Sequence, residues 1–138
     1  MSVAVAHQVS ATAGQALREG AREAVFRETR LEIIHVVDSL DNDIAAANHA
    51  GISDAIEKAL ADDDRLAGVE WELHLVASTP GAGDVAEAIL GKVKEIGPDL
   101  VVIGARQRSP VGKAFLGSVT QNIILDAGVP VLVVKRGV

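Results

Sequence analysis

Three basic residues and three glycines are gathered in one segment, between an apolar run and a helix-like pattern. Arg106, Arg108 and Lys113 lie between Gly104 and Gly117, and no acidic residue lies among them. Glycine lets a backbone approach a ligand closely, and the first amides of a helix have no acceptor within that helix. Cationic side chains beside such amides favour an anion, above all phosphate. The segment therefore predicts a phosphate-binding loop.

The charge distribution makes this segment stand out further. The chain of 138 residues has a net charge of -6, yet residues 101–138 hold five basic residues and one acid. Residues 1–100 hold eight basic and eighteen acidic residues. A local reversal of charge indicates a local anionic ligand, whereas nucleic-acid binding needs a broad basic surface. With 2% aromatic residues and no tyrosine, a base-stacking platform is not expected.

Two familiar phosphate motifs fit the chain poorly. A P-loop ending at Lys113 would need glycine where Gln107 stands and a hydroxyl where Ala114 stands. The run Gly81–Ala86 matches a dinucleotide-binding pattern, but it follows the third expected strand instead of the first. We interpret Gly81–Ala86 as a flexible entry to a helix.

The elements that must position the loop alternate between strand and helix patterns. The expected strands are Val3–Ala6, Leu31–Val37, Trp71–Ala77, Leu100–Gly104 and Val131–Lys135. The expected helices cover about residues 13–25, Asn48–Leu66 and Ala82–Ile96. A last helix is expected to open at Ser118, with a capping-box pattern through Gln121. This order predicts one α/β domain over residues 1–138. Its doubly wound, five-stranded parallel sheet would have the order 3-2-1-4-5, with helices on both faces.

This order of strands also predicts where a ligand binds. Ligands of such sheets lie at the carboxyl ends of the strands, where the connections change direction. In the order 3-2-1-4-5 that point lies between the first and fourth strands. The segment after Gly104 leaves the fourth strand there, and His7 ends the first strand beside it.

Other candidate chemistry is sparse. The chain has no cysteine, which excludes thiolate metal sites and cysteine nucleophiles. Its four histidines, His7, His35, His49 and His74, are not at metal-ligand spacing on a helix, and we interpret them as core or rim residues. No secretion signal or apolar run of membrane-spanning length is evident, so we expect a cytoplasmic protein that does not bind membranes.

Over nearly its full length the chain resembles the universal stress protein family. The resemblance rests on five segments: Val3–Val5, His35–Val37, Asp99–Gly104, Gly104–Ser118 and Ala127–Val134. ATP-binding members have a glycine, two residues, a second glycine, nine residues, and then Gly-Ser or Gly-Thr. Here the spacing is kept, but Gln107 replaces the second glycine. Those members also place an aspartate after the first strand, where this chain has Ala6 and His7.

The resemblance implies a stress-response protein that binds ATP or a related adenine nucleotide, with any Mg²⁺ carried by the phosphates. It places phosphate contacts at Gly104, Gly117, Ser118 and Val119, and backbone contacts to adenine near Val36 and Val37. Arg106 and Ser109 join the phosphate contacts on chemical grounds. A homodimer through the last strand, Val131, Leu132, Val133 and Val134, is also implied.

One alternative stays open, and enzymatic activity is expected to be small. Gln107 and the missing aspartate favour a dimeric interaction module of the same family that binds no nucleotide. Because no general base or metal carboxylate can be assigned from spacing, at most slow hydrolysis of a bound nucleotide is expected.

Overall fold

The computed structural model describes residues 1–7, 13–37, 42–78, 84–104 and 117–135. Its strands are β1 (Ser2–His7), β2 (Arg30–Val37), β3 (Trp71–Ala77), β4 (Leu100–Gly104) and β5 (Val131–Val134). They form one sheet of order β3-β2-β1-β4-β5, in which every neighbouring pair is parallel. The predicted α/β fold and its strand order are confirmed.

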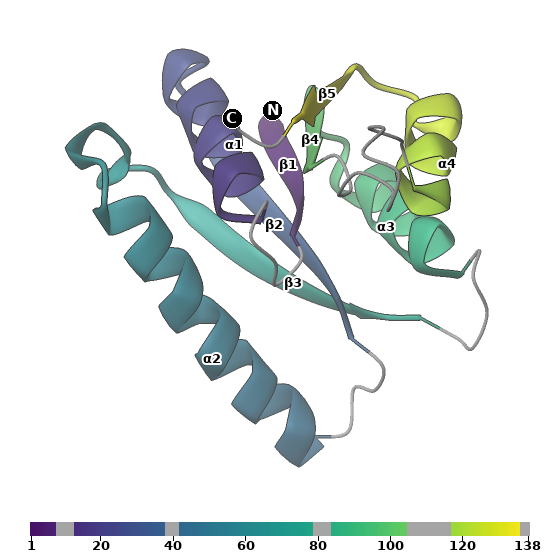
Figure 1. The fold of residues 1–138 in the computed structure, drawn as a ribbon, viewed down its shortest axis with the longest axis horizontal. Coiled ribbons are helices and arrows are strands. Elements are labelled where there is room, and N and C mark those ends of the chain that lie inside the picture. The colour runs from purple at the N-terminus through teal and green to yellow at the C-terminus, as the bar shows by residue number, and fades with distance from the viewer. Residues whose placement is uncertain (8–12, 38–41, 79–83, 105–116, 136–138) are drawn as a thin grey trace, which may run out of the picture.

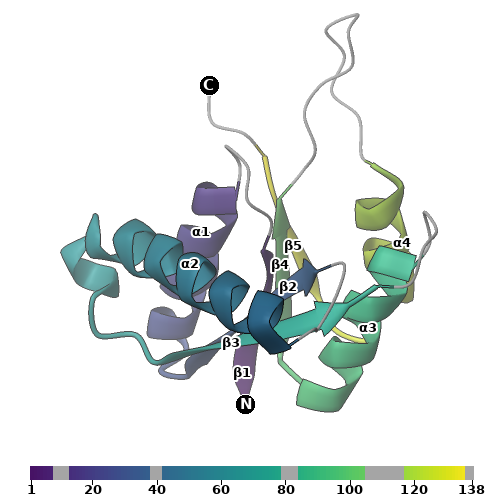
Figure 2. The same cartoon turned by 90° about the horizontal axis from the view of Figure 1, so that it is seen from below.

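Helices cover both faces of this sheet. They are α1 (Ala13–Phe26), α2 (Asn42–Ala61), α3 (Asp84–Ile96) and α4 (Ser118–Asp126), with a short 3₁₀ turn at Asp64–Leu66. Helices α1 and α2 lie on one side of the sheet, and α3 and α4 lie on the other (Figures 1 and 2). In the described part of the chain, no helix is long and apolar enough to cross a membrane.

The side chains of the central strands explain this arrangement. Successive residues of a strand point to opposite faces, so Val3 and Val5 pack toward α1 and α2, whereas Ala4 and Ala6 pack toward α3 and α4. All four side chains are buried, at 0 to 8% exposure. A strand that is apolar on both faces must be covered on both, which is the usual state of a parallel sheet.

The second helix differs from the prediction at both ends. We expected Asn48–Leu66, but α2 begins six residues earlier, at Asn42, and ends at Ala61. The alanine-rich run that follows Asn42 has high helix propensity, which favours the earlier start. At the other end the Asp63 carboxylate accepts the amide of Arg65 and caps a separate 3₁₀ turn, so the α-helix does not continue to Leu66.

The direction of the connections changes between β1 and β4. Ala6 of β1 lies beside Ile103 of β4, so both strands end at the same edge. The helix after β1 covers one face and the helix after β4 covers the other. This is the geometry that opens a ligand-binding crevice in doubly wound sheets.

Candidate functional site

Six of the eight predicted site residues are described by the structure, and all six lie at the carboxyl edge of the sheet. Gly104 ends β4 beside Val134 of β5. Because α4 runs back from this edge to the start of β5, Gly117, Ser118 and Val119 also lie there. Val36 and Val37 end β2 two strands away. The remaining two, Arg106 and Ser109, lie outside the described residues.

The start of α4 is not capped as the sequence suggested. The N-cap residue is Gly117, in an extended conformation, and as a glycine it has no side chain that could cap the helix. Ser118 is instead the first helical residue, and its side chain is exposed. The capping-box prediction for Ser118 is therefore wrong, because the helix begins one residue earlier than that motif requires.

The first turn of α4 has two features that favour an anion. The first intrahelical bond of α4 runs from the Gln121 amide to the Gly117 carbonyl. The amides of the three residues before Gln121 have no acceptor within the helix, and they point along the helix axis toward the edge of the sheet. A helix of nine residues adds a partial positive charge at the same end. Together they can bind an anion such as phosphate.

Two predicted contacts share one apolar cluster. Val36 of β2 and Val119 of α4 are both half-buried and pack against the core between the sheet and helices α3 and α4. Val37 is buried, at 8% exposure, so its side chain offers little surface. The resemblance implies a backbone contact there, but the Val37 carbonyl already accepts the amide of Ser78.

His7 and His35 form a pair that the sequence analysis missed. They are register partners at the ends of β1 and β2, and their Nδ1 atoms are 3.1 Å apart. The ring centroids are 5.3 Å apart, so the two nitrogens face each other between the rings. This geometry fits one hydrogen bond, in which one Nδ1–H donates to the other Nδ1. The signal that could have revealed the pair is the place of each histidine near the end of a neighbouring strand.

Burial keeps both imidazoles neutral. Burial, and then the charge of His35, lower the pKa of His7 to about 4. Burial also lowers the pKa of His35. At neutral pH the first strand therefore offers an uncharged hydrogen-bonding group, where the resemblance leads one to expect a carboxylate. A neutral group does not repel a phosphate as a carboxylate would.

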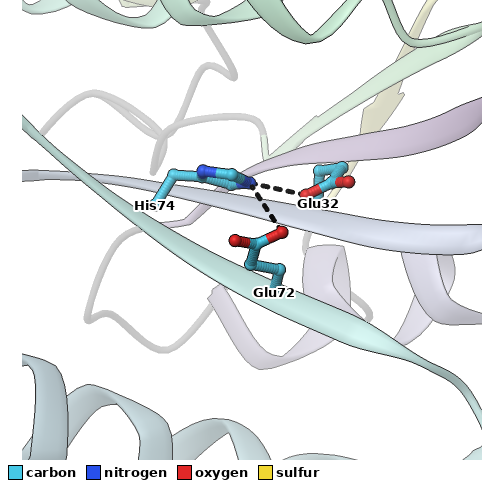
Figure 3. Close-up of side chains that lie close together, drawn as sticks. All are labelled: Glu32, Glu72 and His74. Atoms are coloured by element: carbon cyan, nitrogen blue, oxygen red, sulfur yellow. Dashed lines mark hydrogen bonds and ion pairs between the residues drawn. The ribbon is translucent and has the colours of Figure 1, made fainter.

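A second polar cluster lies away from this edge, nearer the start of the strands. Glu32 of β2 and Glu72 and His74 of β3 bring their side chains together, as Figure 3 shows. The Arg30 guanidinium binds both carboxylates. These residues are the only group of three or more possible metal ligands among the residues that the structure describes.

Comparisons with known proteins agree on one family. The family model described as "Universal stress protein family" matches residues 1–135. A universal stress protein of Mycolicibacterium smegmatis is 34% identical over 120 residues, which are 87% of this chain and 86% of the relative.

Solved structures agree as well. The structure of a universal stress protein from Archaeoglobus fulgidus superposes with a TM-score of 0.74 at 28% identity, covering 98% of each chain. A structure from the same organism, in complex with dAMP, superposes with a TM-score of 0.72 at 24% identity, again over 98% of each chain. The sequence, the strand order and these comparisons together show that the chain belongs to the universal stress protein family.

Proposed function

We propose that this protein binds ATP or a related adenine nucleotide at the carboxyl edge of the sheet, between β1 and β4, as part of a stress response. The observation that carries the proposal is the start of α4. Its N-cap is Gly117, which has no capping side chain, and the first amides of the helix lie at the same edge as Gly104. A helix N-terminus at the switch point of a doubly wound sheet is where such folds bind phosphate groups.

The similar proteins support the ligand class. One solved structure with this fold, the Archaeoglobus fulgidus protein, is in complex with dAMP. At 24% identity that likeness concerns the fold, and it indicates that the fold accommodates an adenine nucleotide. The choice of ATP over other adenine nucleotides comes from the motif resemblance.

The proposed arrangement divides the nucleotide between two parts of the edge. The phosphates accept hydrogen bonds from the amides near Ser118 and Val119 and from the exposed Ser118 hydroxyl, and Arg106 and Ser109 complete this contact. The adenine lies against the backbone near Val36 and Val37. Any Mg²⁺ is carried by the phosphates.

Two measurements test this proposal. The supernatant of the denatured protein is expected to absorb as adenine if nucleotide co-purifies. Isothermal titration with ATP·Mg²⁺ is then expected to show saturable binding. The double substitution of Arg106→Ala with Ser118→Ala is expected to weaken that binding. Arg27→Ala is the matched control, because Arg27 is exposed just after α1, at the opposite edge, and pairs with Glu23. No binding at millimolar ATP refutes the proposal, and equal weakening by the control refutes the site.

The second candidate function is a dimeric interaction module that binds no nucleotide. Gln107 in the phosphate segment favours it, as does the absence of an aspartate after the first strand, where Ala6 and His7 stand. A nucleotide-free dimer that fails the titration would support this alternative. A cytoplasmic location, expected from the sequence, stays a prediction.

A further inference from the structure

The cluster of Glu32, Glu72 and His74 has the composition of a metal site. Glu32 and Glu72 are register partners on β2 and β3, and His74 is two residues farther along β3, so all three side chains lie on one face of the sheet. One possible ligand atom from each of the three lies within 4.8 Å of the other two. His74 Nε2 is 2.5 Å from Glu32 Oε2 and 3.9 Å from Glu72 Oε2 (Figure 3).

We propose that this cluster binds one divalent transition-metal ion of the Zn²⁺ class, through the two carboxylates and the His74 imidazole. Zn²⁺ binds such ligands at about 2.0–2.2 Å, which separates neighbouring ligand atoms by about 3.3 Å in a tetrahedral site. The two distances from His74 Nε2 lie on either side of that value. Side-chain shifts below about 1 Å therefore form the site, and a fourth position stays open to water.

The burial of the three ligands suits this rearrangement. Glu32 is buried, at 6% exposure, and is held in place by its neighbours. The Glu72 side chain is 55% exposed, so it can turn toward the ion and leave a path for it to enter. The His74 side chain, at 16% exposure, lies between the two.

Arg30 provides the outer contact that a buried metal ligand needs. Its Nε lies 2.8 Å from Glu32 Oε1, which leaves Glu32 Oε2 to face His74 and the ion. Hydrogen bonds of this kind orient metal-binding carboxylates. The second contact of Arg30, from Nη2 to Glu72 Oε2 at 2.6 Å, must open or move to the other oxygen. The Arg30 side chain is 47% exposed and can follow that movement.

Charge favours the ion as well. The two carboxylates of Glu32 and Glu72 outnumber the one guanidinium of Arg30, and this excess of negative charge favours a cation.

This site is separate from the proposed nucleotide site. Glu32 and Val36 are four residues apart on β2, which is about 13 Å at the usual rise of a strand. The ion is therefore not the Mg²⁺ that a nucleotide would carry. Its test uses nucleotide-free protein, so the outcome does not depend on nucleotide binding.

The test is a Zn²⁺ titration of the full chain, prepared without a histidine tag and free of nucleotide. We expect one Zn²⁺ per chain by calorimetry, with Glu72→Gln and His74→Gln each weakening binding ~10-fold or more. Glu70→Gln and His49→Gln are matched controls that should bind as wild type does. Glu70 is an exposed glutamate two residues before Glu72, and His49 is an exposed histidine of α2. Mg²⁺ should not compete, because an imidazole ligand suits transition metals better.

A spectroscopic measurement on the unaltered chain needs no variant to fold. Nitrogen-15 NMR of the histidine rings is expected to show Zn²⁺ shifting His74 Nε2 and leaving His7 and His35 unchanged. The proposal is overturned by the absence of stoichiometric Zn²⁺ binding, by variants that bind as tightly as wild type, or by shifts at the His7–His35 pair alone. The cluster would then be an ion-pair network only.

Discussion

Acidification should destabilise this protein through His7, and the structure fixes the direction of the effect. Burial and the neighbouring His35 lower the pKa of His7 from 6.5 to about 4. Between these two values the unfolded chain binds a proton at His7 and the folded chain does not. Stability therefore decreases as the pH falls from about 6.5 to about 4, and His7 contributes no further loss below that range.

The size of the effect follows from the shift in pKa. One pKa unit corresponds to about 1.4 kcal/mol, so the shift of His7 is worth about 3 kcal/mol when fully developed. Because His7 is only 7% exposed, solvent screening reduces this figure little. That loss is a substantial part of the free energy of unfolding of a typical domain, which is about 5–15 kcal/mol.

The assay is urea unfolding of wild type and His7→Asn at a series of pH values between 4 and 7. The free energy of unfolding of wild type should fall by about 3 kcal/mol more than that of His7→Asn across this range. His49→Asn, which alters an exposed histidine, should keep the wild-type dependence on pH.

An NMR titration of the His7 ring gives the same answer without unfolding. The pH midpoint of His7 in the folded protein is expected near 4. A midpoint near 6.5, or parallel unfolding curves for wild type and His7→Asn, would refute the burial of a neutral imidazole pair at this edge.

Three other substitutions test the packing and the edge of the sheet. Gly20→Ala should destabilise the protein by ~1–2 kcal/mol in thermal or urea unfolding, because the new methyl would overlap the buried Val5 Cγ2. Gly91→Ala, where the new methyl lies in open space on α3, should stabilise the protein by ~0.5–1 kcal/mol. Equal changes in stability for Gly20→Ala and Gly91→Ala would contradict the packing of α1 on β1. Val133→Pro should convert the proposed β5-paired dimer to a monomer, by size-exclusion chromatography with light scattering. The Val101 amide donates to the Pro130 carbonyl, and in a parallel ladder alternate residues of β5 face β4, so the Val133 amide points to the open edge. A dimer that persists in Val133→Pro would refute pairing through this edge.

The fold could be predicted because its signals are local and repeated. The apolar runs around Val5 and Val102 are buried on both faces, so they appear in the sequence as short continuous strands. The position of Gly104 at the carboxyl edge followed from the strand order alone.

The parts that sequence reasoning missed depend on tertiary contacts. The pairing of His7 with His35, and of Glu32 with Glu72 and His74, is set by the register between strands, which no local pattern specifies. The predicted start of α4 at Ser118 is confirmed, but the cap residue is Gly117 and not Ser118, because a pattern of serine, threonine and glutamine fits more than one cap position.

The central claim is that the start of α4 and the ends of β2 and β4 bind an adenine nucleotide. The most direct test is an NMR titration of the nitrogen-15-labelled amides with ATP·Mg²⁺. We predict saturable shifts at Gly104, at Gly117 to Val119 and at Val36, with the amides of Arg30 and Glu72 unchanged. The absence of shifts at millimolar ATP, or shifts confined to the Arg30 and Glu72 end of the sheet, would contradict it.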